Sequence, residues 1–193
     1  MRRAVKFPDS KILTGNLKYS SGNSLKNKEI ATILLKEQKN FCAYTDEYIS
    51  TMDANDVEHF NPTLKNTPED GYNNWFCVKH LVNKKKSNKW IQPILHPTAL
   101  DFEERIIYNN GDYFAKSELD DEAKNLISLL QLDDPGLADK RKRYIRRKAA
   151  DMEAYKHDAT TFFKDLIDAN CCDIQYPRAL REEFKIDVLQ LIE

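Results

Sequence analysis

The sequence is poor in glycine and in long apolar segments, and it carries almost no net charge. Five glycines in 193 residues argue against a glycine-rich loop that would bind a nucleotide. A formal net charge of −1 excludes a polycation that attracts nucleic acid as a whole, so any such contact must come from local basic patches. No run of 18 apolar residues exists, and we expect no transmembrane helix.

Cysteine is also scarce, and its four positions do not form the spaced framework of a disulfide-rich protein: Cys42, Cys77, Cys171 and Cys172. The segment 1–6 is basic but is not followed by an apolar run, so it does not resemble a secretory signal. We therefore expect a cytoplasmic protein with reduced thiols and no membrane contact.

What the chain does contain is typical of a folded, helix-rich protein. Hydrophobic residues make up 41% and charged residues 32%, with a mean hydropathy of −0.68. We expect an N-terminal arm and helix (1–40), a small core (41–92) and a helical C-terminal region (93–193), together forming one compact domain. Residues 1–24 are polar and are expected to be a loosely ordered arm.

Periodicity and turn signals predict the elements. Helices are predicted at Asn27–Gln38, Asn83–Trp90, Asp120–Leu132, Leu137–His157, Thr160–Ala169 and Ala179–Ile192. Hairpins are predicted at Phe41–Ile49 and Phe102–Phe114, and further strands at Val57–Phe60 and Trp75–Val78.

The chemistry is concentrated around an acid and a histidine that are adjacent on a predicted strand, Glu58 and His59, with Asn74 and Asn83 following. A neutral imidazole with a pKa near 6.5 can accept a proton at neutral pH. A hard cation such as Mg²⁺ prefers oxygen ligands, which a carboxylate and an amide supply. Neighbouring strand residues point to opposite faces, so both side chains reach one pocket only if the backbone turns them toward it.

Each of these residues also has a plainer explanation. A histidine beside a glutamate is usually a surface residue, and an asparagine at a helix start is usually a cap, so Asn83 would cap its helix. The spacing of His59, Asn74 and Asn83, the preceding hairpin and Lys86 together match the pattern of a known family, and that resemblance favours a functional site.

From the hairpin through His59 to the helix at Asn83, residues 41–90 resemble the HNH endonuclease family. The resemblance implies an α+β fold, with a small ββα-metal HNH core embedded in a mostly helical domain. It implies that His59 is the general base, that Glu58 and Asn83 bind one divalent metal, Mg²⁺ or Mn²⁺, and that Asn74 braces the loop carrying His59. Glu58 stands where the family usually has aspartate.

Many HNH domains also hold a structural zinc between paired Cys-x-x-Cys turns. Here only Cys42, Cys77 and His80 remain as possible ligands, which falls short of a closed four-ligand site. We therefore expect no structural zinc, and we expect His80 to be a surface or helix-start residue.

The segments 37–44, 57–62, 72–74, 96–111 and 126–146 are similar to those of PtuB-type HNH effectors from Septu and retron-linked anti-phage systems. This resemblance implies a defence nuclease that cuts DNA and works with an ATPase partner of the PtuA type. Two alternatives stay open: a non-catalytic subunit that docks on an ATPase, and an RNase acting on tRNA.

Two basic clusters could contact nucleic acid. Lys84, Lys85, Lys86 and Lys89 lie on or beside the predicted Asn83 helix, and Arg143 and Arg147 belong to a second cluster at 140–148. The second cluster fits equally well a solvated helix or a face that pairs with an acidic partner. No base-reading motif is present, so we predict no sequence specificity.

Overall fold

A computed structural model describes residues 1–192 and shows a mixed α+β fold in which helices hold 48% of the chain. Glu193, the last residue of the region expected to be helical, lies outside the described residues. The strands form two small antiparallel sheets, β1 with β2 and β3 with β4. The α+β class predicted from the sequence is confirmed.

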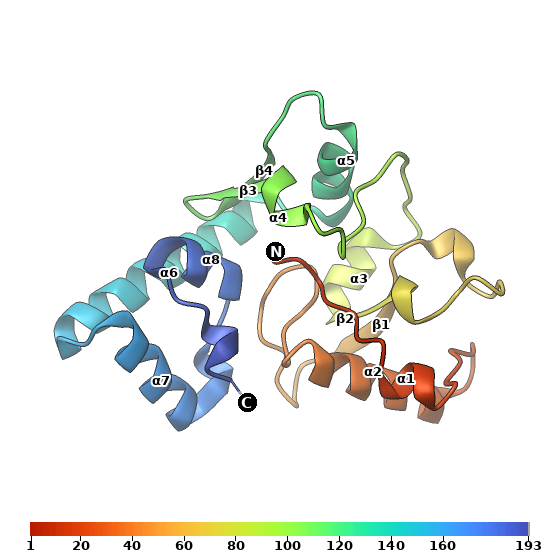
Figure 1. Ribbon diagram of the computed structural model, residues 1–193, viewed down its shortest axis with the longest axis horizontal. Helices are drawn as coiled ribbons and strands as arrows, with labels where there is room; N and C mark the ends of the chain where they lie inside the picture. The colour runs from red at the N-terminus through yellow and green to blue at the C-terminus, as the bar shows by residue number, and fades with distance from the viewer. Residues whose placement is uncertain (193) are drawn as a thin grey trace.

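The elements follow one another along the chain as shown in Figure 1. The helices are α1 (Lys11–Thr14), α2 (Ser24–Glu37), α3 (His80–Lys86), α4 (Phe102–Arg105), α5 (Asp121–Leu130), α6 (Pro135–Tyr155), α7 (Ala159–Asn170) and α8 (Pro177–Phe184). The strands are β1 (Asn55–His59), β2 (Trp75–Lys79), β3 (Ile106–Asn109) and β4 (Asp112–Ala115).

Two clusters of buried side chains hold these elements together. The larger cluster joins the N-terminal segment, α2, the β1–β2 sheet and α5, so it continues past residue 93, where the sequence suggested a boundary. The smaller cluster joins α7, α8 and the C-terminal turn around Phe41. Helices α6, α7 and α8 form a separate group beside the β1–β2 region (Figure 1). The β1–β2 sheet is therefore part of the larger core.

The N-terminal segment is an integral part of this core, which corrects the expectation of a loose arm. Met1 is fully buried, and its amino group lies 3.5 Å from Asp46. Ser10 is also buried and donates a hydrogen bond of 2.5 Å to Glu37 of α2. The polar composition of residues 1–24 concealed these contacts, because they are made to residues far away in the chain.

The predicted hairpin at 41–49 is present only as a short antiparallel turn without regular strands. Phe41 and Tyr48 form only an isolated β-bridge, and Cys42 donates to the carbonyl of Glu47 across a tight turn. Asp46 lies in the turn and adopts a positive φ of 59°, which hairpin turns commonly use. Ile49 donates to the carbonyl of Asn40 at 2.7 Å.

The region after β2 also departs from the prediction. Helix α3 begins at His80, directly after the strand, and not at Asn83. Lys79 occupies the N-cap position and has extended backbone angles. Residues 102–105 are helical, and the second hairpin is confined to β3 and β4. Its turn requires Gly111 (φ 84°), where a Cβ would meet the carbonyl of Ala138 in α6 at 2.8 Å.

Other helices agree with the sequence. Asp120, Asp134 and Asp158 accept hydrogen bonds from the first turns of α5, α6 and α7, so each of these predicted helices has a side-chain cap. The last predicted helix is shorter, since α8 ends at Phe184 and is followed by a 3₁₀ turn at Val188–Gln190. No helix within residues 1–192 is long and apolar enough to cross a membrane.

Candidate active site

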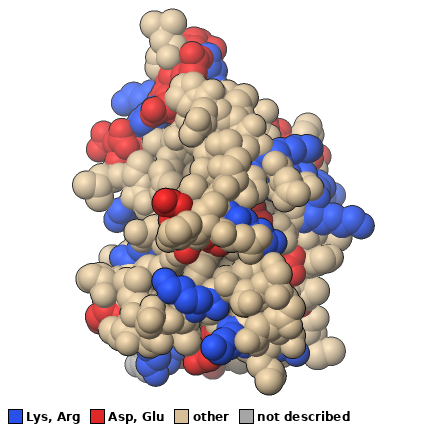
Figure 2. Space-filling view, turned by 90° about the vertical axis from the view of Figure 1, so that its right-hand side faces the viewer, with Lys and Arg blue, Asp and Glu red and all other residues tan. Residues whose placement is uncertain are grey.

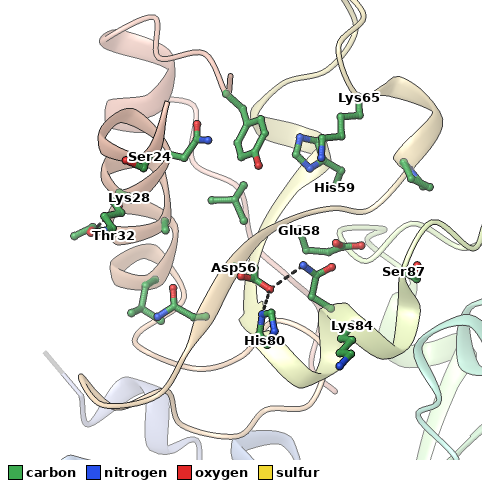
Figure 3. A pocket seen from close by; sticks show the side chains of 18 of the residues that line it. Ser24, Lys28, Thr32, Asp56, Glu58, His59, Lys65, His80, Lys84 and Ser87 are labelled. Carbon is green, nitrogen blue, oxygen red and sulfur yellow. Dashed lines mark hydrogen bonds and ion pairs between the residues drawn. The ribbon is translucent and has the colours of Figure 1, made fainter. Parts of the chain in front are cut away.

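A cavity of about 910 Å³ lies between α2, β1 and α3. Figure 3 shows α2 on one side and α3 on the other, with β1 between them. It is lined by residues of α2 and the segment before it (Tyr19, Ser24, Asn27, Lys28, Ala31, Thr32, Leu35), of β1 (Asn55, Asp56, Val57, Glu58, His59), of the following loop (Pro62, Lys65) and of α3 and its end (His80, Asn83, Lys84, Ser87, Asn88).

Strand β1 brings Glu58 and His59 to this cavity from its two faces. Its antiparallel register pairs Glu58 with Phe76 and His59 with Trp75 of β2. Successive residues alternate, so Glu58 turns toward α3 while His59 lies on the side of Lys65 (Figure 3). Both side chains nevertheless line the same cavity, which satisfies the condition set by the sequence.

Glu58 is buried and forms an ion pair with Lys86 of α3, with 2.5 Å between Oε1 and Nζ. Burial raises the pKa of the Glu58 carboxyl, and the Lys86 ammonium opposes that shift. Lys86 is itself only 2% exposed and also donates to the carbonyl of His59. Its expected contact with nucleic acid is therefore wrong for this conformation, because the ammonium is directed into the protein.

His59 is buried in a partly aromatic setting. The ring of Tyr19 stands edge-on to the imidazole with 4.6 Å between centroids, and the ring of Trp75 lies 6.2 Å away. Burial is the main cause that lowers the pKa of His59, and the nearby Lys65 ammonium acts in the same direction, against Asp70. The imidazole is therefore neutral at pH 7, the form that accepts a proton.

Asn74 closes the loop that follows His59. Its amide oxygen accepts from the backbone N–H of Asn61 at 2.7 Å, and its amide nitrogen donates to the carbonyl of Asn61 at 3.1 Å. The same nitrogen donates to Asp70 at 3.0 Å. One buried side chain thus ties together both ends of the 61–74 loop.

Asp56 and His80 join the site, and the sequence interpretation gave neither of them a role there. Oδ2 of Asp56 lies 2.8 Å from Nδ1 of His80 and accepts from the amide of Asn83 at 2.8 Å (Figure 3). His80 begins α3 and its side chain is 54% exposed, as expected of a helix-start residue. Asp56 could have been found from its place two residues before Glu58, on the same strand face.

Asn83 has a different role in its helix from the one expected. It lies in the middle of α3 and does not cap it. Since its amide nitrogen is held by Asp56, its Oδ1 is the atom left for a ligand.

The donor set can be tested against a divalent cation. Across residues 1–192, no group of three His, Cys, Asp or Glu side chains lies close enough to hold an ion. The carboxylate of Glu58 and Oδ1 of Asn83 still offer two hard oxygens at one cavity. Two protein ligands suit Mg²⁺, which keeps several waters and is completed by substrate phosphate. The residues therefore fit a weakly held cation, for which Lys86 would have to give up Glu58.

The cysteines near the site are buried thiols. Burial raises the pKa of Cys42, and it raises that of Cys77 to about 12. Sγ of Cys77 lies 3.6 Å from Oδ1 of Asn55, and the third candidate zinc ligand, His80, is held by Asp56. The expectation that no structural zinc binds remains a prediction.

The cations expected to meet nucleic acid are dispersed. Lys84 lines the cavity, whereas Lys85 turns away to Asp134 and Lys89 is exposed beyond the end of α3. Arg143 and Arg147 are exposed on α6, outside the lining of the cavity. Lysines and arginines form separate patches mixed with acids in Figure 2. The cavity gains two lysines that the sequence did not point to, Lys28 of α2 and Lys65 of the loop.

Comparison of the chain with protein-family models, with curated proteins and with solved structures gave no match. The function must therefore be argued from the geometry of the cavity and from the residues that line it.

Proposed function

We propose that the protein is a metal-dependent endonuclease of the HNH type, with a ββα-metal core formed by β1, β2 and α3, that hydrolyses phosphodiester bonds of DNA. The observation that carries the proposal is the single cavity lined by His59, Glu58 and Asn83. A proton acceptor and two hard oxygen donors around one space are what hydrolysis of a phosphodiester requires.

The residues of the chain divide this work among them. His59 is neutral because burial lowers its pKa, and it takes the proton of the attacking water. Glu58 and the Oδ1 of Asn83 would hold the divalent metal, Mg²⁺ or Mn²⁺, which supplies charge stabilisation for the phosphate and the leaving oxygen. Asn74 holds the loop after His59 in place.

Three lysines around the cavity are suited to a polyanion. Lys28, Lys65 and Lys84 approach it from α2, from the loop and from α3 (Figure 3). Their charge attracts phosphate without reading bases, so the protein binds nucleic acid with little sequence preference and with strong dependence on salt.

One observation favours the alternative of a non-catalytic assembly subunit. Glu58 is already paired with Lys86, and Asn83 is already bonded to Asp56, so neither predicted ligand is fully free. An ATPase partner of the PtuA type and a role in anti-phage defence remain predictions from the resemblance. A partner that moved α3 would change the Lys86 and Asn83 contacts together, because both residues lie on that helix.

The proposal is tested with plasmid DNA and tRNA digested in parallel, with Mg²⁺, with Mn²⁺ and with EDTA, in the presence and absence of an ATPase partner. We expect EDTA-sensitive nicking of the plasmid and a loss of about a hundredfold or more in His59→Ala, because a general base contributes about that factor. His157→Ala is the matched control, since His157 is exposed in the turn after α6.

Equal cleavage by His59→Ala and by the unchanged protein would refute the catalytic assignment. Digestion of tRNA alone would favour the RNase. No cleavage of either substrate, combined with stable binding to the ATPase, would favour the assembly subunit.

A further inference from the structure

Asp70 lies next to His59 but does not line the cavity, and no contact predicted from the sequence involves it. It stands in the loop between Asn61 and Asn74, and its side chain is 7% exposed. Oδ2 of Asp70 lies 3.1 Å from Nε2 of His59, whose own side chain is 6% exposed. A buried carboxylate next to a buried imidazole nitrogen is an arrangement that fixes the ring.

The carboxylate is itself held in one orientation. Its other oxygen, Oδ1, accepts from the indole N–H of Trp75 at 2.7 Å and from the amide of Asn74 at 3.0 Å. Both donors use the same oxygen, so Oδ2 remains for His59. An ionised carboxylate can only accept. Among residues 1–192, Nε2 is buried without a hydrogen bond of regular geometry, and its contact with Oδ2 of Asp70 is an ion-pair contact at 3.1 Å.

We propose that Asp70 is a positioning residue that keeps the proton of neutral His59 on Nε2 and leaves the lone pair of Nδ1 facing the cavity. This inference rests on the proposed function for its catalytic consequence, but its structural part stands alone. The nitrogen that carries the proton is set by the partner of that nitrogen. His59 lines the cavity, and its Nε2 lies against Asp70, so Nδ1 is the ring nitrogen left to accept a proton from water.

The substitution Asp70→Asn separates this role from a merely structural one. Trp75 and Asn74 both donate, so the amide oxygen of the new side chain must take the place of Oδ1. Its NH₂ group then faces Nε2 of His59, and two donors cannot share that contact. The ring must move its proton to Nδ1, which removes the base from the cavity while the size of the side chain is unchanged.

The first measurement is a long-range ¹H–¹⁵N correlation spectrum of the His59 ring in the full-length protein, well above the ordinary pKa of histidine, with His59→Gln for assignment. We expect an Nε2–H ring in the unchanged protein and an Nδ1–H ring in Asp70→Asn. An Nδ1–H ring in the unchanged protein would overturn the proposal even if the variant failed to fold. The same tautomer in both proteins would also overturn it.

The second measurement is plasmid cleavage at increasing substrate concentration. We expect kcat of Asp70→Asn to fall about a hundredfold or more while KM stays within about twofold, because the lost group acts on the base and not on binding. Glu69→Gln is the control, since this neighbour is exposed, carries the same charge and has no contact with His59.

The two measurements keep the inference separate from the proposed function. If the unchanged protein cuts no substrate, the nuclease assignment fails and the ring spectra still decide the role of Asp70. If Asp70→Asn changes the tautomer as expected but retains full kcat, the inference about catalysis is overturned and the nuclease assignment stands.

Discussion

Helices α3 and α6 are both rich in lysine and arginine, yet they use their cations differently. Each helix buries one of them: Lys86 of α3 pairs with the carboxylate of Glu58, and Arg141 of α6 donates to the backbone carbonyls of Gly111 and Leu132. Most of the other cations on the two helices are exposed, whereas Lys142 and Lys148 of α6 are half-buried. The comparison teaches that a basic run in a sequence mixes cations that hold the fold with cations that meet solvent, and that only packing separates the two.

The largest expected effect compares the two buried cations. Lys86→Met leaves the carboxylate of Glu58 buried without its partner and should lower the free energy of unfolding by roughly 3 to 5 kcal/mol at neutral pH. Arg141→Met leaves two backbone carbonyls without their donor and removes the contact of the guanidinium with the Tyr113 ring, whose centroid lies 4.6 Å away. It should lower the free energy of unfolding by about 2 to 3 kcal/mol. Urea unfolding followed by circular dichroism measures both.

The control for this comparison is Lys85→Met, which alters an exposed neighbour of Lys86 and should change stability by less than about 0.5 kcal/mol. The double variant Glu58→Gln/Lys86→Met should recover part of the loss, because the isolated charge is removed. If Lys86→Met proved as stable as Lys85→Met, the ion pair would have no structural role.

A smaller effect compares the exposed cations. Lys84 lines the cavity, whereas Arg147 lies on α6 outside it. Lys84→Ala should weaken DNA binding and reduce the slope of log K against log salt by about 0.9, the value for one phosphate contact on a duplex. Arg147→Ala should change the slope less. Fluorescence anisotropy with labelled DNA over a range of salt measures this, and a larger effect at Arg147 would place the nucleic acid on α6.

The last comparison concerns Lys6, a mostly buried cation that lies outside both helices. Its ammonium donates to the carbonyl of Trp75 and lies 4.2 Å from the centre of the Phe76 ring. Burial lowers the pKa of Lys6 to about 7, against the raising effect of Glu37. The unfolded chain therefore holds one more proton than the folded protein between about pH 7 and the ordinary lysine pKa, so stability should rise with pH in that window.

Unfolding by urea at several pH values tests this expectation. Lys6→Met should flatten the rise in stability with pH, while Lys85→Met should not. An unchanged rise in Lys6→Met would show that another group causes it.

Local signals in the sequence predicted much of the fold. The apolar periodicity of α5, α6 and α7 and the turn residues between them are short-range features, and the structure confirms those helices. The hairpin at 41–49 is reduced to a single antiparallel bridge and its flanking hydrogen bonds. Its turn also contacts a distant residue, since Tyr176 donates to the carbonyl of Asp46. The expectation of a loose N-terminal arm failed because Met1 meets Asp46 only in the folded chain.

In the candidate site, too, local sequence features were predicted and long-range contacts were not. The sequence by itself determined the identity and spacing of His59, Glu58, Asn74 and Asn83, because each motif position is a local choice of residue. Only the tertiary structure decided that Lys86 turns inward, that Asp56 holds Asn83 and that Asp70 reaches His59. These contacts join strand, loop and helix through side chains, and no local pattern encodes which of several acids and lysines will meet when the chain closes around its core.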